Sequence, residues 1–169
     1  GAGNGLGQAM TKHLVEAGAR VIMVGRNLDK LVQTRDELGL TGDQSRLESC
    51  DVADPASVDQ LALRLRDESV SILVNNAGIP GPVSDLVDID PDDWDNVFAT
   101  NVRGVYLICR AFLPAMMKSR SGDIINIASV SGKRPLVGRT PYCASKMAVI
   151  GLTTTLAAEA GPYDIRVNS

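Results

Sequence analysis

The stretch Gly1-Ala2-Gly3-Asn4-Gly5-Leu6-Gly7 leads directly into a segment, residues 6–17, whose apolar residues fall on one helical face. An apolar run at residues 21–24 follows and predicts a buried strand. Glycines let backbone amides approach a phosphate closely, and a helix N-terminus favours its negative charge. The alternative is that this stretch is a glycine-rich loop without a binding function. A turn that opens a helix and is followed by a strand, however, fits a dinucleotide site.

The alternation of helix and strand continues along the rest of the chain. Helical patterns cover residues 28–38, 55–65, 92–117 and 141–160, and strand patterns cover residues 47–52, 70–74, 124–128 and 165–168. Repeated strand–helix–strand units imply a parallel sheet with helices on both faces. The sequence therefore predicts an α/β fold.

Polar residues follow the predicted strands at their carboxyl ends, where open parallel sheets bind ligands: Asp51, Asn75-Asn76-Ala77-Gly78 and Ser129. Tyr142 and Lys146 lie four apart in the next helix, so they share one face about one turn apart. A cation within reach of a phenol favours the phenolate. Such a pair is often structural, but beside a strand-end serine it predicts proton transfer to or from a carbonyl or alcohol oxygen.

Composition limits the classes of function. The chain has 169 residues, 44% of them hydrophobic and 22% charged, which suits one globular domain with a sizeable core. A net charge of −3 and the lack of a long apolar run predict neither a nucleic-acid partner nor a membrane partner. Cys50, Cys109 and Cys143 form no C-x-x-C pair, so we expect buried thiols in a reducing, cytoplasmic setting. His13 is the only histidine and is expected at the surface, and no metal site is predicted.

Four motifs occur in order along the chain: Gly1-x-x-x-Gly5-x-Gly7, Asn75-Asn76-Ala77-Gly78, Ser129 and Tyr142-x-x-x-Lys146. Together they resemble the short-chain dehydrogenase/reductase family, and the resemblance covers essentially the whole chain. It implies one Rossmann-type domain over residues 1–169, a doubly wound parallel sheet in three α/β/α layers. It also implies hydride transfer between a nicotinamide cofactor and an alcohol or carbonyl substrate.

The resemblance implies a role for each catalytic position. Tyr142 would be the acid/base, Lys146 would bind the nicotinamide ribose and support the tyrosine, and Ser129 would orient the substrate oxygen. Asn101 matches the asparagine that holds a water in the proton relay. The alternative for Asn101 is a helix-interior side chain bonded to backbone.

The resemblance also implies a set of cofactor-binding residues: Gly1, Gly5, Leu6 and Gly7 at the pyrophosphate, Asp51, Val52 and Asn75 at the adenosine, Ala77 and Gly78 in close backbone approach, and Tyr142 with Lys146. NAD sites place an acid after the second strand of the fold, whereas NADP sites use arginine. Here Gly25 stands in the acid's place and Arg26 follows. We predict NADP(H) in preference to NAD(H); the alternative is that Arg26 is a solvated residue without bias.

Other functions stay open at this point. A catalytically silent sensor or scaffold of the same fold would be expected to lose the tyrosine or lysine, and a nucleotide- or S-adenosylmethionine-binding transferase would not need them. The loop 130–139 carries Lys133, Arg134 and Arg139, which suits an anionic or acyl-carrier substrate as in 3-oxoacyl reductases, or is simply solvated. Sugar, steroid and cyclic-alcohol substrates remain open.

The chain begins within a turn and stops at a strand, so we expect a fragment, incomplete at both ends, that lacks a first strand and the C-terminal substrate-binding region. An interior strand's absence would leave backbone groups unpaired, so residues 1–169 alone are predicted to be unstable and inactive. The helices at 92–117 and 142–160 correspond to those that pair between subunits in the family. The full-length protein is therefore expected to be a homodimer or homotetramer.

Overall fold

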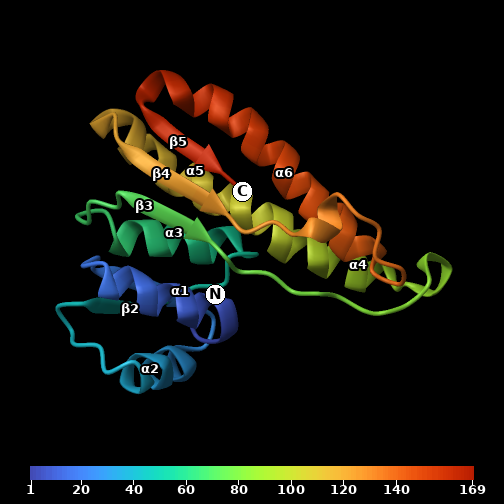
Figure 1. Ribbon diagram of the computed structural model, residues 1–169, viewed down its shortest axis with the longest axis horizontal. Helices are drawn as coiled ribbons and strands as arrows, with labels where there is room; N and C mark the ends of the chain where they lie inside the picture. Colours follow the sequence, from blue (N-terminus) through green and yellow to red (C-terminus); the bar gives the residue numbers. More distant parts are fainter. The chain divides into compact units, whose positions relative to one another are not determined.

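The computed structural model describes residues 1–169 and contains two parallel sheets (Figure 1). The chain divides into two compact units, Gly1–Asp51 and Val52–Ser169. Each unit holds one sheet, and a helix connects every two strands that pair. This is the α/β alternation that the sequence predicts.

The first unit contains α1 (Gly5–Glu16), β1 (Val21–Gly25), α2 (Leu28–Glu37) and β2 (Ser45–Ser49). β1 and β2 pair in parallel along their whole length. Asn27 begins α2, because its side chain accepts a hydrogen bond from the Lys30 amide at 3.0 Å. Met23 of β1 and Leu31 of α2 are both fully buried and form the centre of this unit's core.

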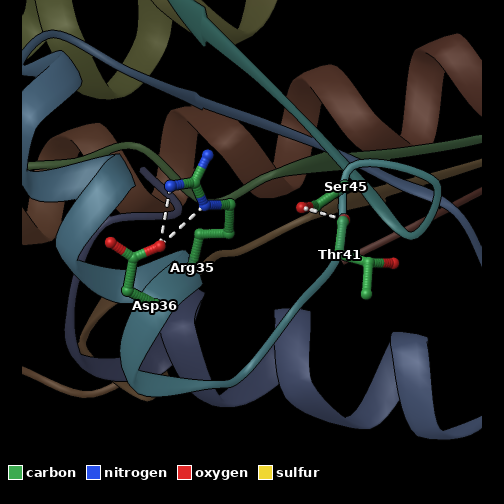
Figure 2. A network of polar contacts seen from close by, with 4 residues as sticks. All are labelled: Arg35, Asp36, Thr41 and Ser45. Carbon is green, nitrogen blue, oxygen red and sulfur yellow. Dashed lines mark hydrogen bonds and ion pairs between the residues drawn. The ribbon is translucent and has the colours of Figure 1, made fainter.

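Figure 2 shows local polar contacts near the end of α2 and in the turn that leads to β2. Arg35 donates through Nε and Nη2 to Oδ1 of Asp36, at 2.9 and 2.7 Å. The Ser45 hydroxyl donates to the Thr41 carbonyl at 3.0 Å and closes the turn before β2. Ion pairs of this exposed kind contribute little to stability, so we assign them a local structural role only.

The second unit contains a three-stranded parallel sheet in the order β3-β4-β5. Its elements are α3 (Pro55–Arg64), β3 (Ile72–Asn75), α4 (Pro91–Phe98), α5 (Gly104–Ser119), β4 (Gly122–Asn126), α6 (Thr140–Ala160) and β5 (Ile165–Asn168). Asp54 and Asp90 cap α3 and α4, each followed by a proline at the first helical position, as the sequence predicts.

Helices cover the sheet of the second unit. α5 packs against both α3 and α6, so the three helices lie side by side. Ile124 of β4 and Val149 of α6 are fully buried in the core between sheet and helices, and Met116 of α5 is 1% exposed. No helix of the structure has both the length and the apolar character needed to cross a membrane.

The structure differs from the predicted elements in one functionally relevant place. The helix expected over residues 92–117 is interrupted by a π-helical segment, Ala99–Arg103. Such segments within helices occur frequently at functional sites. Asn101 lies at its centre and is 1% exposed. The strands predicted at 47–52, 70–74 and 124–128 are each shifted by one to three residues, while the last strand is confirmed at Ile165–Asn168.

Candidate active site

Tyr142 and Lys146 share one face of α6, as predicted from their spacing. The ammonium nitrogen of Lys146 lies 5.7 Å from the centroid of the Tyr142 ring. It also donates a hydrogen bond of 2.7 Å to the carbonyl of Ile127, just beyond β4. Lys146 is 5% exposed, and this burial lowers the pKa of its ammonium. Since an ammonium has three donors, the bond to Ile127 orients the side chain and leaves further hydrogens for a ligand.

Ser129 follows β4 and begins a short 3-10 turn, Val130–Gly132. Its hydroxyl oxygen accepts a hydrogen bond from the Ser131 amide at 3.1 Å. Because the backbone uses this oxygen as an acceptor, the hydroxyl proton is available for donation. The hydroxyl can thus donate to another oxygen, as the expected role toward a substrate oxygen requires.

Gly132 brings this turn against α6. A Cβ at Gly132 would lie 2.9 Å from the carbonyl carbon of Lys146 and 2.9 Å from the backbone nitrogen of Met147. Only glycine allows the turn with Ser129 to approach the helix with Tyr142 this closely. The sequence analysis missed this residue, because its contact is with another element of the fold.

Asn101 holds the start of the loop after β3. Its side-chain oxygen accepts from the Ile79 amide at 2.8 Å, and its side-chain nitrogen donates to the Ile79 carbonyl at 3.0 Å. The same nitrogen donates to the Ser145 hydroxyl at 3.0 Å, which in turn donates to the Tyr142 carbonyl at 2.7 Å. The side-chain amide of Asn101 is thus bonded to backbone, which is the alternative to a water-holding role that the sequence left open. Ser145, which the sequence analysis missed, links it to α6.

Gly78 lies beside both groups. A Cβ there would come within 3.2 Å of Oδ1 of Asn101 and 3.5 Å of Nζ of Lys146. A side chain at this position would therefore crowd both groups. A glycine-lined surface next to a buried ammonium with unused donors fits the hydroxyl groups of a cofactor ribose.

Asn75 lies inside the second unit and is 8% exposed. Its side-chain nitrogen donates to Oδ1 of Asn126 at 2.8 Å and to Sγ of Cys109 at 3.3 Å. Asn126 donates in turn to the Thr153 hydroxyl at 3.0 Å. The Asn75 side chain, expected toward the adenosine, thus ties β3 to β4 and α5. Burial raises the pKa of the Cys109 thiol to about 11.

The positions of the other cysteines and of the histidine can also be compared with what the sequence predicts. Cys50 is buried as expected, whereas Cys143 is only half-buried, and none of the three cysteines forms a disulfide. The imidazole of His13 is exposed, as predicted, and lies 3.1 Å from the carboxylate of Glu16. No group of three or more histidine, cysteine or acidic side chains is arranged to hold a metal ion.

The glycine-rich turn of the first unit is anchored to the end of β1. The backbone nitrogens of Gly1 and Ala2 donate to the carbonyl of Val24 at 2.6 and 3.1 Å. Gly5 begins α1 with a φ of 49°, a left-handed conformation that favours glycine. No acidic residue lies in the first turn of α1, and Leu6 is exposed while Gly7 is buried. The exposed start of α1 fits the negative charge of a phosphate.

Arg26 is exposed directly after β1, in the same unit. A Cβ at the preceding Gly25 would lie 3.2 Å from Cδ2 of Leu31, so a side chain at Gly25 would crowd the core. Asp51 and Val52 are half-buried, and Val52 packs closely against Gly104 at the start of α5.

Comparisons with known proteins identify the family of the chain. The family model for short chain dehydrogenases matches residues 1–169. The chain belongs to the short-chain dehydrogenase family. It is 39% identical, over 100% of its length, to a granaticin polyketide synthase putative ketoacyl reductase of Streptomyces violaceoruber, of which it covers 63%. The chain thus spans less than two thirds of that relative's length.

Solved structures of short-chain dehydrogenases extend the comparison. One is a metagenomic short-chain oxidoreductase in complex with NADP, with 34% identity, a TM-score of 0.92, and coverage of 100% of this chain and 77% of that one. Another is a 3-ketoacyl-(acyl-carrier-protein) reductase from Brucella melitensis complexed with NADH, with 34% identity, a TM-score of 0.92, and coverage of 99% and 70%. These likenesses confirm the predicted family and its three-layer α/β Rossmann-type fold.

Proposed function

We propose that this short-chain dehydrogenase transfers a hydride between NADP(H) or NAD(H) and a secondary alcohol or ketone, with Tyr142 as the general acid/base. One observation carries the proposal. The Lys146 ammonium is buried, donates to the carbonyl of Ile127 just beyond β4 at 2.7 Å, and lies 5.7 Å from the centroid of the Tyr142 ring, while Ser129 follows Ile127 by two residues. The nicotinamide supplies or accepts the hydride when it is bound.

The residues of the chain manage the proton and the substrate oxygen. In the reductive direction Ser129 donates a hydrogen bond to the carbonyl oxygen, and Tyr142 gives its phenol proton to that oxygen as the carbon receives the hydride. The Lys146 ammonium stabilises the negative charge that develops on the phenol and returns a proton to it. Positioned acid–base groups of this kind contribute roughly 10²–10⁴-fold to rate. Asn101 supports the relay by holding Ile79 and, through Ser145, the first turn of α6.

We propose NADP(H) as the preferred cofactor. Arg26 offers an exposed guanidinium at the carboxyl end of β1, where its charge and planar donors suit a 2′-phosphate. Gly25 packs against Leu31 and leaves little room for an acid that would select NAD. The glycine-rich turn, bonded to Val24 at the end of the same strand, would bind the pyrophosphate.

A 3-oxoacyl compound is the substrate class that we favour. The supporting observations are the likeness to a putative ketoacyl reductase and to a 3-ketoacyl-(acyl-carrier-protein) reductase. Lys133 and Arg134 are exposed in the loop after Ser129, where they suit an anionic carrier group. Sugar, steroid and cyclic alcohols are the competing substrates, and a matched panel of ketones would separate them.

Residues 1–169 are proposed to form one domain, and the full-length protein is proposed to assemble as a homodimer or homotetramer. Tyr106 of α5 and Met147 of α6 are each 50% exposed, and such apolar surface on the long helices suits pairing between subunits. Light scattering of the full-length protein in solution would give the number of subunits.

The test of the proposed function uses the full-length protein and NADPH deuterated at the ring carbon that carries the hydride. Transfer of deuterium to the product carbon, detected by mass spectrometry across the ketone panel, is the expected result. Tight NADPH binding without deuterium transfer to any ketone would favour a catalytically silent sensor or scaffold instead.

A further inference from the structure

Two loops leave the candidate site in the second unit, drawn in green and orange at the right of Figure 1. The first, residues 79–85, begins at Ile79, which Asn101 holds by two hydrogen bonds. The second, residues 130–139, connects Ser129 to the helix with Tyr142. A substrate oxygen held by Ser129 and Tyr142 would therefore have these loops beside it.

Arg139 joins the two loops. Its Nη1 donates to the carbonyls of Pro80 and Gly81, at 3.3 and 3.1 Å. One residue earlier, the carbonyl of Gly138 accepts a hydrogen bond of 3.0 Å from the Ser84 amide. The side chain of Arg139 and the backbone beside it thus bind both ends of the first loop.

The same residue begins α6. The carbonyl of Arg139 accepts from the Cys143 amide at 2.9 Å, so its backbone forms the start of the helix that carries Tyr142. The position of Tyr142 is therefore connected through one residue to the first loop. Gly81 fixes the other end of this connection, because a Cβ there would lie 2.6 Å from Cγ2 of Val97 in α4, and its φ of 65° favours glycine.

We propose that Arg139 is a positioning residue that clamps these two loops together and thereby shapes the site for substrate. The inference rests on the proposed function for its kinetic consequence. It revises one expectation from sequence, in which Arg139 belongs with Lys133 and Arg134 to a basic loop that attracts an anionic substrate. The guanidinium of Arg139 is instead bonded to backbone carbonyls, whereas Lys133 and Arg134 are exposed.

The experiment compares Arg139→Gln and Arg139→Lys with Arg66→Gln in the full-length protein. Arg66 is an exposed arginine paired with Asp67 after α3, so it controls for the loss of a guanidinium. Each variant is assayed with anionic and neutral ketones that the wild type reduces. Amide hydrogen exchange at Ser84 reports the clamp independently of activity, because that amide bonds to Gly138.

In Arg139→Gln, we expect KM to rise about tenfold for anionic and neutral ketones alike, because the loss of one hydrogen bond from a charged donor has an effect of that size. We expect kcat to change less than about twofold. Exchange at Ser84 is expected to rise, the melting temperature to stay unchanged, and Arg139→Lys to restore part of both properties. Arg66→Gln is expected to match the wild type.

A rise in KM for anionic ketones only would overturn the clamp and show that Arg139 binds the substrate's charge. Unchanged KM with unchanged exchange at Ser84 would overturn it as well. If Arg139→Gln does not fold, Arg139→Lys serves as the test, because lysine lacks the planar guanidinium. Wild-type KM and wild-type exchange at Ser84 in Arg139→Lys would then contradict the clamp. A wild type without turnover, but with faster exchange at Ser84 in Arg139→Gln, would refute the proposed function and leave the clamp standing.

Discussion

The two candidate sites, one in each unit, are built in different ways. In the second unit, side chains determine the geometry, since Lys146, Asn101 and Ser145 are buried and each bonds to a backbone carbonyl of a neighbouring segment or helix turn. In the first unit, the turn from Gly1 to Gly7 presents backbone groups instead of side chains. The Val24 carbonyl and the buried hydroxyl of Thr34 hold this turn, and Arg26 is exposed beside it.

This difference has consequences for substitution. A packed side chain in the second unit has several partners, so its removal displaces groups that touch the substrate. An exposed side chain in the first unit acts on the cofactor alone, so its removal changes affinity in a graded way. The next four changes, at Lys146, Gly132, Ser145 and Arg26, are ordered from the largest expected effect to the smallest.

Lys146→Met should have the largest effect among these changes, because it removes the charge next to Tyr142 and the bond to Ile127. We expect kcat of the full-length enzyme to fall by roughly 10²–10⁴-fold. Because burial lowers the pKa of Lys146, its ammonium loses its proton at a lower pH than the ~10.4 of an exposed lysine. Reduction by the wild type should therefore decline with rising pH before that value is reached.

Lys118→Met is the control for this change, since Lys118 is exposed on α5. Comparable rates in the two variants would show that Lys146 has only a structural role.

Gly132→Ala should displace the turn with Ser129 from α6, because the added Cβ meets backbone at 2.9 Å. A shift of about 1 Å in a reacting group can lower turnover by ~10²-fold, and we expect a loss of up to that size in kcat. Gly161→Ala is the matched control, because a Cβ there has no neighbour within 4 Å and the φ is −52°. Full activity in Gly132→Ala would mean that Ser129 is not positioned by this contact.

Ser145→Ala should have a moderate effect, because Asn101 keeps its two bonds to Ile79 and loses only the one to Ser145. One hydrogen bond contributes about 0.5–1.5 kcal/mol, which corresponds to a roughly 3- to 10-fold loss in kcat. Thr154→Ala is the control, since the Thr154 hydroxyl also bonds to a helix carbonyl, that of Ile150, but is exposed. An equal effect in both variants would argue against the link through Asn101.

Arg26→Ala should have the smallest effect on turnover and should change cofactor preference instead. We expect the ratio of kcat/KM for NADPH over NADH to fall about tenfold, as for one lost contact to a charged group. Arg35→Ala, which removes a half-buried arginine of the first unit that pairs with Asp36, should leave the ratio unchanged. Equal kcat/KM values for the two cofactors in the wild type, or an advantage for NADH, would refute the predicted preference.

The fold could be predicted from sequence because its signals are local. The cap and proline at Asp54 and Asp90 begin helices where expected, and α6 runs over Thr140–Ala160 as its pattern predicts. The motif at Ser129, Tyr142 and Lys146 was visible because strand ends and helical spacing place those residues together. The family and the three-layer fold followed from the order of these motifs.

The contacts that complete the site could not be predicted from sequence, because they join segments far apart in the chain. Nothing local to Asn101 shows that Ile79 is its partner, and nothing local to Gly132 shows that a helix backbone lies 2.9 Å away. From the sequence, Arg139 was grouped with its basic neighbours. In the structure its guanidinium donates to the backbone carbonyls of Pro80 and Gly81. The π-helical segment at Ala99–Arg103 likewise has no signal in the helical pattern of the sequence.

The measurement that tests the account most directly is the turnover of Tyr142→Phe beside Tyr163→Phe in the full-length enzyme. Tyr163 is an exposed phenol in the short 3-10 turn that follows α6, so it controls for the loss of a hydroxyl. We predict that Tyr142→Phe abolishes ketone reduction while NADPH binding, followed by fluorescence titration, stays at the wild-type level. Tyr163→Phe should keep full activity. A Tyr142→Phe enzyme that retained most of its kcat would contradict the assignment of Tyr142 as the acid/base.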